Sequence, residues 1–149
     1  MREKYKISFD VWGLILFLII MIPNFIWFAV PAPNDILRAE SATEIVDIIA
    51  SVFQVVMVAS LCFLISKDCK KPMKKRNLIE IIISILIYFI GWIFYYNGVT
   101  SPIIVLDLCI VPCLAFIFFS IGRKNRIALI SAIIFLVCHF IYGIVNFIL

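Results

Sequence analysis

The chain of 149 residues is 65% hydrophobic and only 15% charged, and its mean hydropathy is +1.18. A soluble domain of this size is roughly half apolar, so this chain has too little polar surface to cover a globule in water. The net charge of +4 does not indicate nucleic-acid binding, because basic residues beside membrane spans are attracted to anionic lipid headgroups instead.

Five apolar segments are long enough to cross a bilayer, which takes about 20 residues in a helix. Helices are expected because lipid-exposed backbone must satisfy its own hydrogen bonds. The first apolar run is longer than the core of a signal peptide, so we expect it to remain in the protein. Because the loops are short, we expect consecutive helices to be antiparallel neighbours. The sequence therefore predicts an all-α integral membrane bundle, a single transmembrane domain over residues 1–149, with helices at approximately 9–30, 45–66, 78–96, 102–121 and 127–148.

Basic residues lie on one side of every predicted span. Arg38 is the single exception among the 13 Lys and Arg residues. The positive-inside rule then predicts a cytoplasmic N-terminus, and five spans place the C-terminus outside. The protein is therefore expected in the cell membrane as a multi-pass protein. The basic clusters that carry this prediction are Arg2, Lys4 and Lys6, then residues 67–76, then Arg123, Lys124 and Arg126.

The first predicted span carries Pro23 and Asn24, and a loop at 31–38 follows it. A proline inside a helix removes a backbone hydrogen bond, and in transporters such breaks often mark binding sites. The alternative is a static kink that improves packing. In the loop, Asp35 and Arg38 have the i,i+3 spacing of an ion pair. We interpret this loop either as a structured lid over an outward pocket or as a simple surface connector.

The second predicted span opens with Ser41 and Glu44, which have the spacing of a capping box. Further along, Asp47, Ser51 and Gln54 recur at i, i+4 and i+7 and therefore share one helical face. Two other interpretations stay open. The acid at 47 is also placed to complement the positive end of the helix dipole. The amides of Asn24, Gln54 and Asn146 are also consistent with hydrogen bonds that join helices.

The third and fourth spans add aromatic and acidic candidates. Tyr88, Trp92 and Tyr95 form a stripe at i, i+4 and i+7, which is also typical of core packing. Asp107 lies within the fourth span, followed by Pro112. An acid at the bilayer centre costs about 2.5–3.5 kcal/mol on insertion scales, so an intramembrane acid is a functional candidate by default.

The fifth span carries His139, Tyr142 and Asn146 at i, i+3 and i+7, again on one face. A single histidine is also consistent with an ordinary hydrogen bond between helices. Cys109 and Cys113 share a face of the fourth span, where small polarizable packing residues are the simpler interpretation. No metal site or cofactor is predicted.

Polar and aromatic stripes on several helices are expected to turn inward together, because lipid disfavours them on the outside. The sequence therefore predicts a pocket that opens outward. Its predicted ligand-binding residues are Asn24, Asp47, Gln54, Tyr88, Trp92, Asp107, His139, Tyr142 and Asn146.

Such a pocket favours binding or transport of a small solute, including a cationic one. Asp107 and Asp47 would attract a cation or protonated amine, and Trp92 and Tyr88 would offer it aromatic faces. The bilayer is the expected surrounding, and a homodimer or a larger membrane complex is the expected assembly. The alternative function is an accessory subunit of a larger membrane complex with no transport activity of its own. An intramembrane enzyme is disfavoured, because the sequence has no phosphate loop, zinc-protease motif or serine-hydrolase motif.

Overall fold

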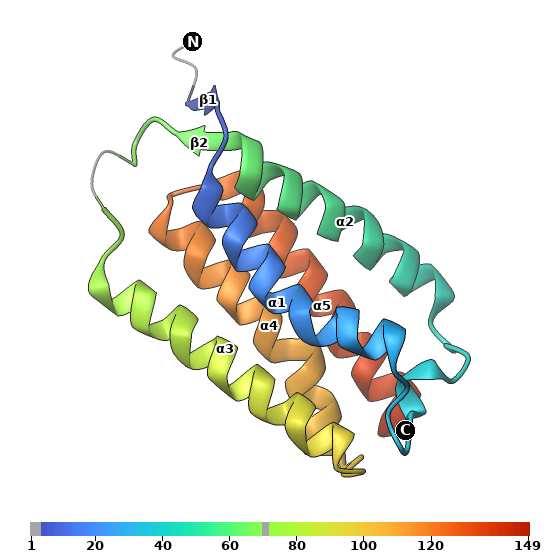
Figure 1. The fold of residues 1–149 in the computed structure, drawn as a ribbon. Helices are drawn as coiled ribbons and strands as arrows, with labels where there is room; N and C mark the ends of the chain where they lie inside the picture. The colour runs from blue at the N-terminus through green and yellow to red at the C-terminus, as the bar shows by residue number, and fades with distance from the viewer. Residues whose placement is uncertain (1–3, 70–71) are drawn as a thin grey trace.

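The computed structural model describes residues 4–69 and 72–149 and consists mainly of helices (Figure 1). Each of the long helices in this part of the chain is long and apolar enough to cross a membrane, which confirms a multi-pass, all-α membrane protein. Their ends lie within three residues of the predicted positions. Of the predicted basic clusters, Arg2, Lys70 and Lys71 lie outside the described residues. The five helices are α1 (Val11–Ala29), α2 (Glu44–Phe63), α3 (Lys75–Tyr96), α4 (Pro102–Gly122) and α5 (Arg126–Phe147).

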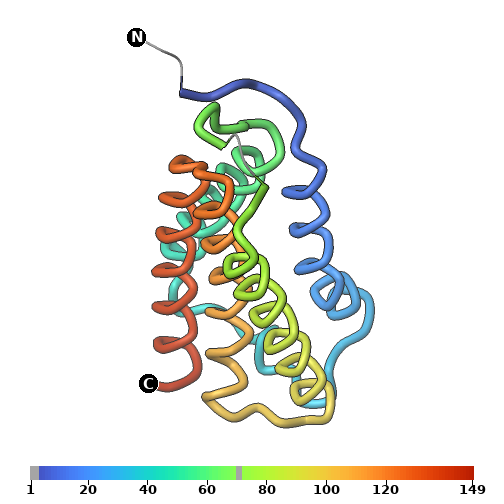
Figure 2. The backbone as a smooth tube through the Cα atoms, turned by 90° about the vertical axis from the view of Figure 1, so that its left-hand side faces the viewer, coloured from blue at the N-terminus to red at the C-terminus, as the bar shows by residue number. Residues whose placement is uncertain are grey.

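Four helices form a layer in which α2 packs on α5, α5 on α4 and α4 on α3 (Figures 1 and 2). Helix α1 lies across one face of this layer and packs mainly on α2. The prediction that consecutive helices are neighbours is therefore wrong for α2 and α3, which lie at opposite edges of the layer. The segment 64–74 permits this separation, because about 11 residues can span up to roughly 35 Å when extended.

A short two-stranded sheet joins the N-terminal segment to the end of α2. β1 (Tyr5–Ile7) pairs antiparallel with β2 (Leu64–Ser66), with Tyr5 opposite Ser66. The sequence pattern does not predict these strands, because three residues show too little alternation and the second strand continues the apolar run of α2. The chain therefore leaves that helix three residues earlier than predicted. We call the end of the bundle that carries this sheet and the α4–α5 turn the basic end.

At the basic end, α1 and α2 cross closely at Gly13 and Leu61. A Cβ atom on Gly13 would lie 2.5 Å from the Leu61 carbonyl oxygen, so a larger residue would push the two helices apart. The Asp10 side chain caps α1 by accepting from the Trp12 N–H at 3.0 Å. The Asp10 N–H donates to the Cys62 carbonyl at 2.7 Å. These contacts hold the start of α1 against the end of α2.

The capping box predicted at Ser41 and Glu44 does not form. Helix α2 begins at Glu44, its N-cap is Thr43, and no side chain caps it. A capping box needs the acid at the third helical position, whereas here the acid is the first. The Ser41 hydroxyl instead accepts from the Thr43 N–H at 3.1 Å, within the loop that precedes the helix.

Candidate functional site

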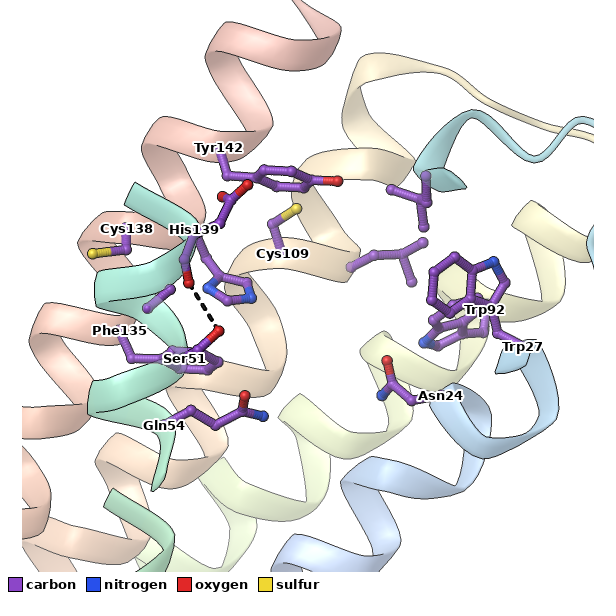
Figure 3. Close-up of a pocket in the computed structure, with 14 residues that line it drawn as sticks. Asn24, Trp27, Ser51, Gln54, Trp92, Cys109, Phe135, Cys138, His139 and Tyr142 are labelled. Atoms are coloured by element: carbon purple, nitrogen blue, oxygen red, sulfur yellow. Dashed lines mark hydrogen bonds between the residues drawn. The ribbon is translucent and has the colours of Figure 1, made fainter. Parts of the chain in front are cut away.

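A cavity of about 310 Å³ lies between α1 and the helix layer, in the half of the bundle away from the basic end (Figure 3). All five helices and the α1–α2 loop contribute to its wall. Polar side chains alternate there with aromatic and aliphatic ones, a combination typical of small-molecule sites. Six of the nine residues predicted for a ligand site line this cavity: Asn24, Asp47, Gln54, Trp92, His139 and Tyr142.

Polar side chains from α2 and α5 enter the cavity from one side. Figure 3 shows Gln54, His139 and Tyr142 pointing into it, because the polar faces of these two helices turn toward α1. The Ser51 hydroxyl is satisfied within its own helix, donating to the Asp47 carbonyl at 2.9 Å. The Asp47 carboxylate accepts one long hydrogen bond, from the Thr43 hydroxyl at 3.3 Å. This acid therefore retains acceptor capacity at the cavity wall.

Side chains from α1 and α3 form the opposite wall. The Asn24 amide nitrogen donates to the Tyr88 hydroxyl at 2.7 Å and to the Ile20 carbonyl at 3.2 Å. The rings of Trp27 and Trp92 are neighbours, with centroids 6.4 Å apart and planes tilted by 48° (Figure 3). Tyr88 is buried and does not line the cavity, but its hydroxyl orients the asparagine that does.

Two polar atoms in the cavity wall are buried without a hydrogen-bond partner among the described residues: Nε1 of Trp92 and Nδ1 of His139. Each has an electrostatic neighbour, the Tyr88 hydroxyl and the Phe135 carbonyl respectively, but neither pair meets hydrogen-bond geometry. A buried polar atom left unpaired costs about 1–3 kcal/mol. The two side chains come from opposite walls of the cavity, and both nitrogens lie beneath its surface.

The carboxylate of Asp35 accepts four of the hydrogen bonds that hold the loop between α1 and α2. Its Oδ1 accepts from Trp27 Nε1 at 2.8 Å and from the Tyr95 hydroxyl at 2.9 Å. Its Oδ2 accepts from Arg38 Nε at 2.7 Å and from the Ala32 N–H at 3.3 Å. The predicted ion pair between Asp35 and Arg38 is therefore present. Burial raises the pKa of Asp35, but these four hydrogen bonds outweigh it and the pKa lies below its usual value.

The same loop covers one end of the cavity. Leu37 lies in the cavity wall, and its N–H donates to the Tyr95 hydroxyl at 3.1 Å. The Arg38 guanidinium lies over the Trp27 ring, 4.8 Å from the centroid, and donates to the Trp27 carbonyl. The loop is thus an ordered part of the site and is anchored to both α1 and α3.

Asp107 lies outside this cavity. Its Oδ2 occupies the space that a Cβ atom on Gly91 of α3 would fill, and it has no hydrogen-bond partner in the described chain. Successive helical residues are turned by about 100°. Because Leu108 and Cys109 face the cavity, Asp107 turns toward α3 instead.

Asn146 also lies outside the cavity. Its Oδ1 accepts from the Ala42 N–H at 2.7 Å, and its Nδ2 donates to the Thr43 hydroxyl at 2.9 Å. The side chain thus fastens the end of α5 to the start of α2, the helix-joining role that was the alternative interpretation for buried amides.

Sequence reasoning did not assign Trp27, Leu37 or Tyr95 to the site. A tryptophan and a tyrosine near the end of a span are typical of the interfacial aromatic belt. The sequence spacing could have identified Trp27 as a cavity residue, because it follows Asn24 at i+3 and therefore shares its helical face. No local pattern indicates Leu37, because only the folded loop brings it to the cavity.

Cys109 and Cys113 are both buried in α4. Cys113 Sγ donates to the Cys109 carbonyl one turn earlier at 3.3 Å. Residues 4–69 and 72–149 contain no group of three His, Cys, Asp or Glu side chains placed to hold a metal ion.

Comparison of the chain with protein-family models, with curated protein sequences and with solved structures finds no match.

Proposed function

We propose that this multi-pass membrane protein binds, for uptake or sensing, a small organic ammonium compound in the cavity between α1 and the helix layer. The observation that carries the proposal is the pair of buried, unpartnered atoms, Trp92 Nε1 and His139 Nδ1, on opposite walls of one cavity. A ligand that turns these two side chains toward the cavity and pairs with both atoms recovers the free energy that their burial costs. The volume of about 310 Å³ fits a small metabolite.

The chemistry of the wall supports a cation with hydrogen-bonding groups. Asp47 supplies a carboxylate with free acceptor capacity, and it takes the role that the sequence assigned first to Asp107. The ring of Trp92 favours a positively charged group through cation–π attraction, whereas that of Trp27 already carries the Arg38 guanidinium. Gln54 adds an amide that can donate to and accept from the ligand.

Binding to this cavity is testable by removing one group at a time from the purified protein. With a panel of small ammonium compounds, we expect D47N to weaken binding more than tenfold, because a charge-assisted hydrogen bond contributes about 1.5–3 kcal/mol. We expect W92F to weaken it about fivefold, because the ring remains and only the N–H donor is lost. Equilibrium binding and ligand-induced thermal stabilisation measure both effects.

The control for W92F is W12F, which removes the same donor from an exposed tryptophan outside the cavity. W12F should bind like the unaltered protein. Equal affinities of W92F, D47N and the unaltered protein would contradict the proposal. If no compound of the panel binds while a membrane partner co-purifies in constant ratio, the accessory function takes its place.

The proposal places the cavity on the outer side of the membrane, with the basic end in the cytoplasm, as the distribution of Lys and Arg predicts. We therefore expect alkaline phosphatase fused after Leu149 to be active and green fluorescent protein at the same site to be dark. Fusions after Lys124, in the α4–α5 turn, should behave in the opposite way. A fluorescent fusion after Leu149 would show that the C-terminus lies in the cytoplasm and would contradict the proposed orientation.

A further inference from the structure

We propose a second site, for one anionic phospholipid, in an apolar groove between α1 and α3 at the basic end, with its phosphate on Arg123. The groove has a volume of about 530 Å³, and Arg123 is the only charged residue in its described lining. Leu16 and Ile19 of α1 form one side, and Ile81 and Ile85 of α3 form the other. This site lies at the opposite end of the bundle from the polar cavity and does not depend on its function.

The groove faces the hydrocarbon of the bilayer. α1 and α3 make few contacts with each other, so the groove between them runs along the first half of both helices. The apolar side chains at its edges are exposed, including Ile15, Leu78 and Ile82. Water gains no hydrogen bonds in such a space, and an unfilled gap loses dispersion contacts. An acyl chain supplies those contacts.

Arg123 stands where the apolar groove meets a polar pocket. It also lines a small cavity of about 120 Å³ together with Asp10, Ser66 and Asn125. Its Nη2 donates to Asp10 Oδ1 at 3.1 Å, while its Nε is buried and has no partner among the described residues. A phospholipid has the same order of apolar and polar parts, because its acyl chains are joined to a phosphate headgroup. A guanidinium at this junction matches the planar, bidentate geometry that phosphate oxygens favour.

The surrounding charge selects an anionic headgroup over a zwitterionic one. Lys74, Lys75 and Arg76 open α3 beside the groove, and Lys124 follows Arg123 directly. Each basic residue near the membrane surface attracts an anionic lipid by about fivefold in affinity. Phosphatidylglycerol carries the net negative charge that this cluster favours, whereas phosphatidylcholine does not.

Asp10 opposes the same ligand. Its carboxylate holds one Arg123 N–H and would repel a phosphate on that guanidinium. Replacing it with asparagine keeps the cap on α1, because Asn and Asp are equally good N-cap residues. The variant D10N thus removes the negative charge beside Arg123 with little change to the helix start. The proposal therefore predicts opposite effects for two neighbouring substitutions.

The experiment measures lipid binding to the purified, delipidated full-length chain by native mass spectrometry, with phosphatidylglycerol and phosphatidylcholine of the same acyl chains. We expect phosphatidylglycerol to bind at least about fivefold more tightly. R123Q should abolish this preference and D10N should increase it. R126Q, which removes an exposed charge from outside the groove, should keep it. I85W, which fills the groove, should weaken binding of both lipids.

Equal binding of the two lipids would overturn the proposal, and so would an unchanged preference in R123Q. If R123Q fails to fold, D10N decides, and a D10N affinity no higher than that of the unaltered chain overturns it. Displacement of the lipid by glycerol 3-phosphate at equal concentration would also overturn it, because the site would then be a soluble phosphate site.

Discussion

Replacing Asp35 with alanine should lower the free energy of unfolding by about 2–4 kcal/mol, because hydrogen bonds to a charged group contribute about 1.5–3 kcal/mol and leaving buried donors unpaired adds to this loss. The carboxylate accepts from Trp27, Tyr95, Arg38 and the Ala32 N–H. Loss of this acceptor removes all four bonds at once and leaves the loop held by the bonds from Leu37 to Tyr95 and from Asn34 to Gly98. Unfolding in mixed detergent micelles, followed by circular dichroism, measures the change.

The control is E40A, which removes an exposed acid from the same loop. Surface substitutions of this kind usually change stability by less than about 0.5 kcal/mol. A D35A protein as stable as E40A would show that the loop is not held through this carboxylate.

The same acid gives stability a defined pH dependence. The pKa of Asp35 is lowered from 3.8 on folding, so the folded state favours the ionised form. Its contribution is therefore fully present above the unfolded pKa and is lost as the pH falls through the folded pKa. We expect the unaltered protein to lose stability more steeply below about pH 4 than D35N does. Parallel profiles for the two proteins would contradict this.

Replacing Asn125 with alanine should have an effect of similar size at the basic end. The Asn125 side chain caps α5 by accepting from the Ala128 N–H at 3.1 Å. Its amide nitrogen donates to the Ser60 and Leu64 carbonyls, both at 2.9 Å. The Ser60 carbonyl still accepts from the Leu64 N–H, so only the Leu64 carbonyl loses a needed partner. A lost cap costs about 1 kcal/mol and an unpaired carbonyl about 1–3 kcal/mol. We expect a total loss of about 2–4 kcal/mol in the same unfolding measurement.

N125S separates the two contributions of this side chain. Serine keeps an N-cap oxygen but lacks the amide that donates to α2, so N125S should fall between the unaltered protein and N125A. N97A is the matched control, because Asn97 is an exposed asparagine whose amide bonds only within its own helix. If N125S is as stable as the unaltered protein, the bonds to α2 contribute nothing.

The sequence predicts the helices well, because a span of about 20 apolar residues has one stable conformation in lipid. It predicts less of how the helices pack. A polar stripe shows that a helix face turns inward, but not which neighbour it meets. Gln54 and His139 both line the cavity because α2 packs on α5. These two helices are neighbours in space although they are not consecutive in the chain. Asp107 lies outside the cavity although the next residue, Leu108, lines it, because successive residues of α4 point in directions about 100° apart.

The loop shows a second limit of sequence reasoning. The i,i+3 spacing predicts the bond between Asp35 and Arg38. The bonds from Trp27 and Tyr95 to the same carboxylate depend on where α1 and α3 end in space. Those two aromatic residues have the positions of interfacial anchors, and only the folded structure shows that they are hydrogen-bond donors to the loop.

Helix α1 forms a wall of both the polar cavity and the apolar groove. Asn24 and Trp27, near one end, border the polar cavity, and Trp12 and Leu16, near the other, border the apolar groove. A molecule that tilts this helix as it enters either space must alter the shape of the second. By thermodynamic linkage, the lipid composition of the membrane would then change solute affinity by the same factor by which the solute changes lipid affinity.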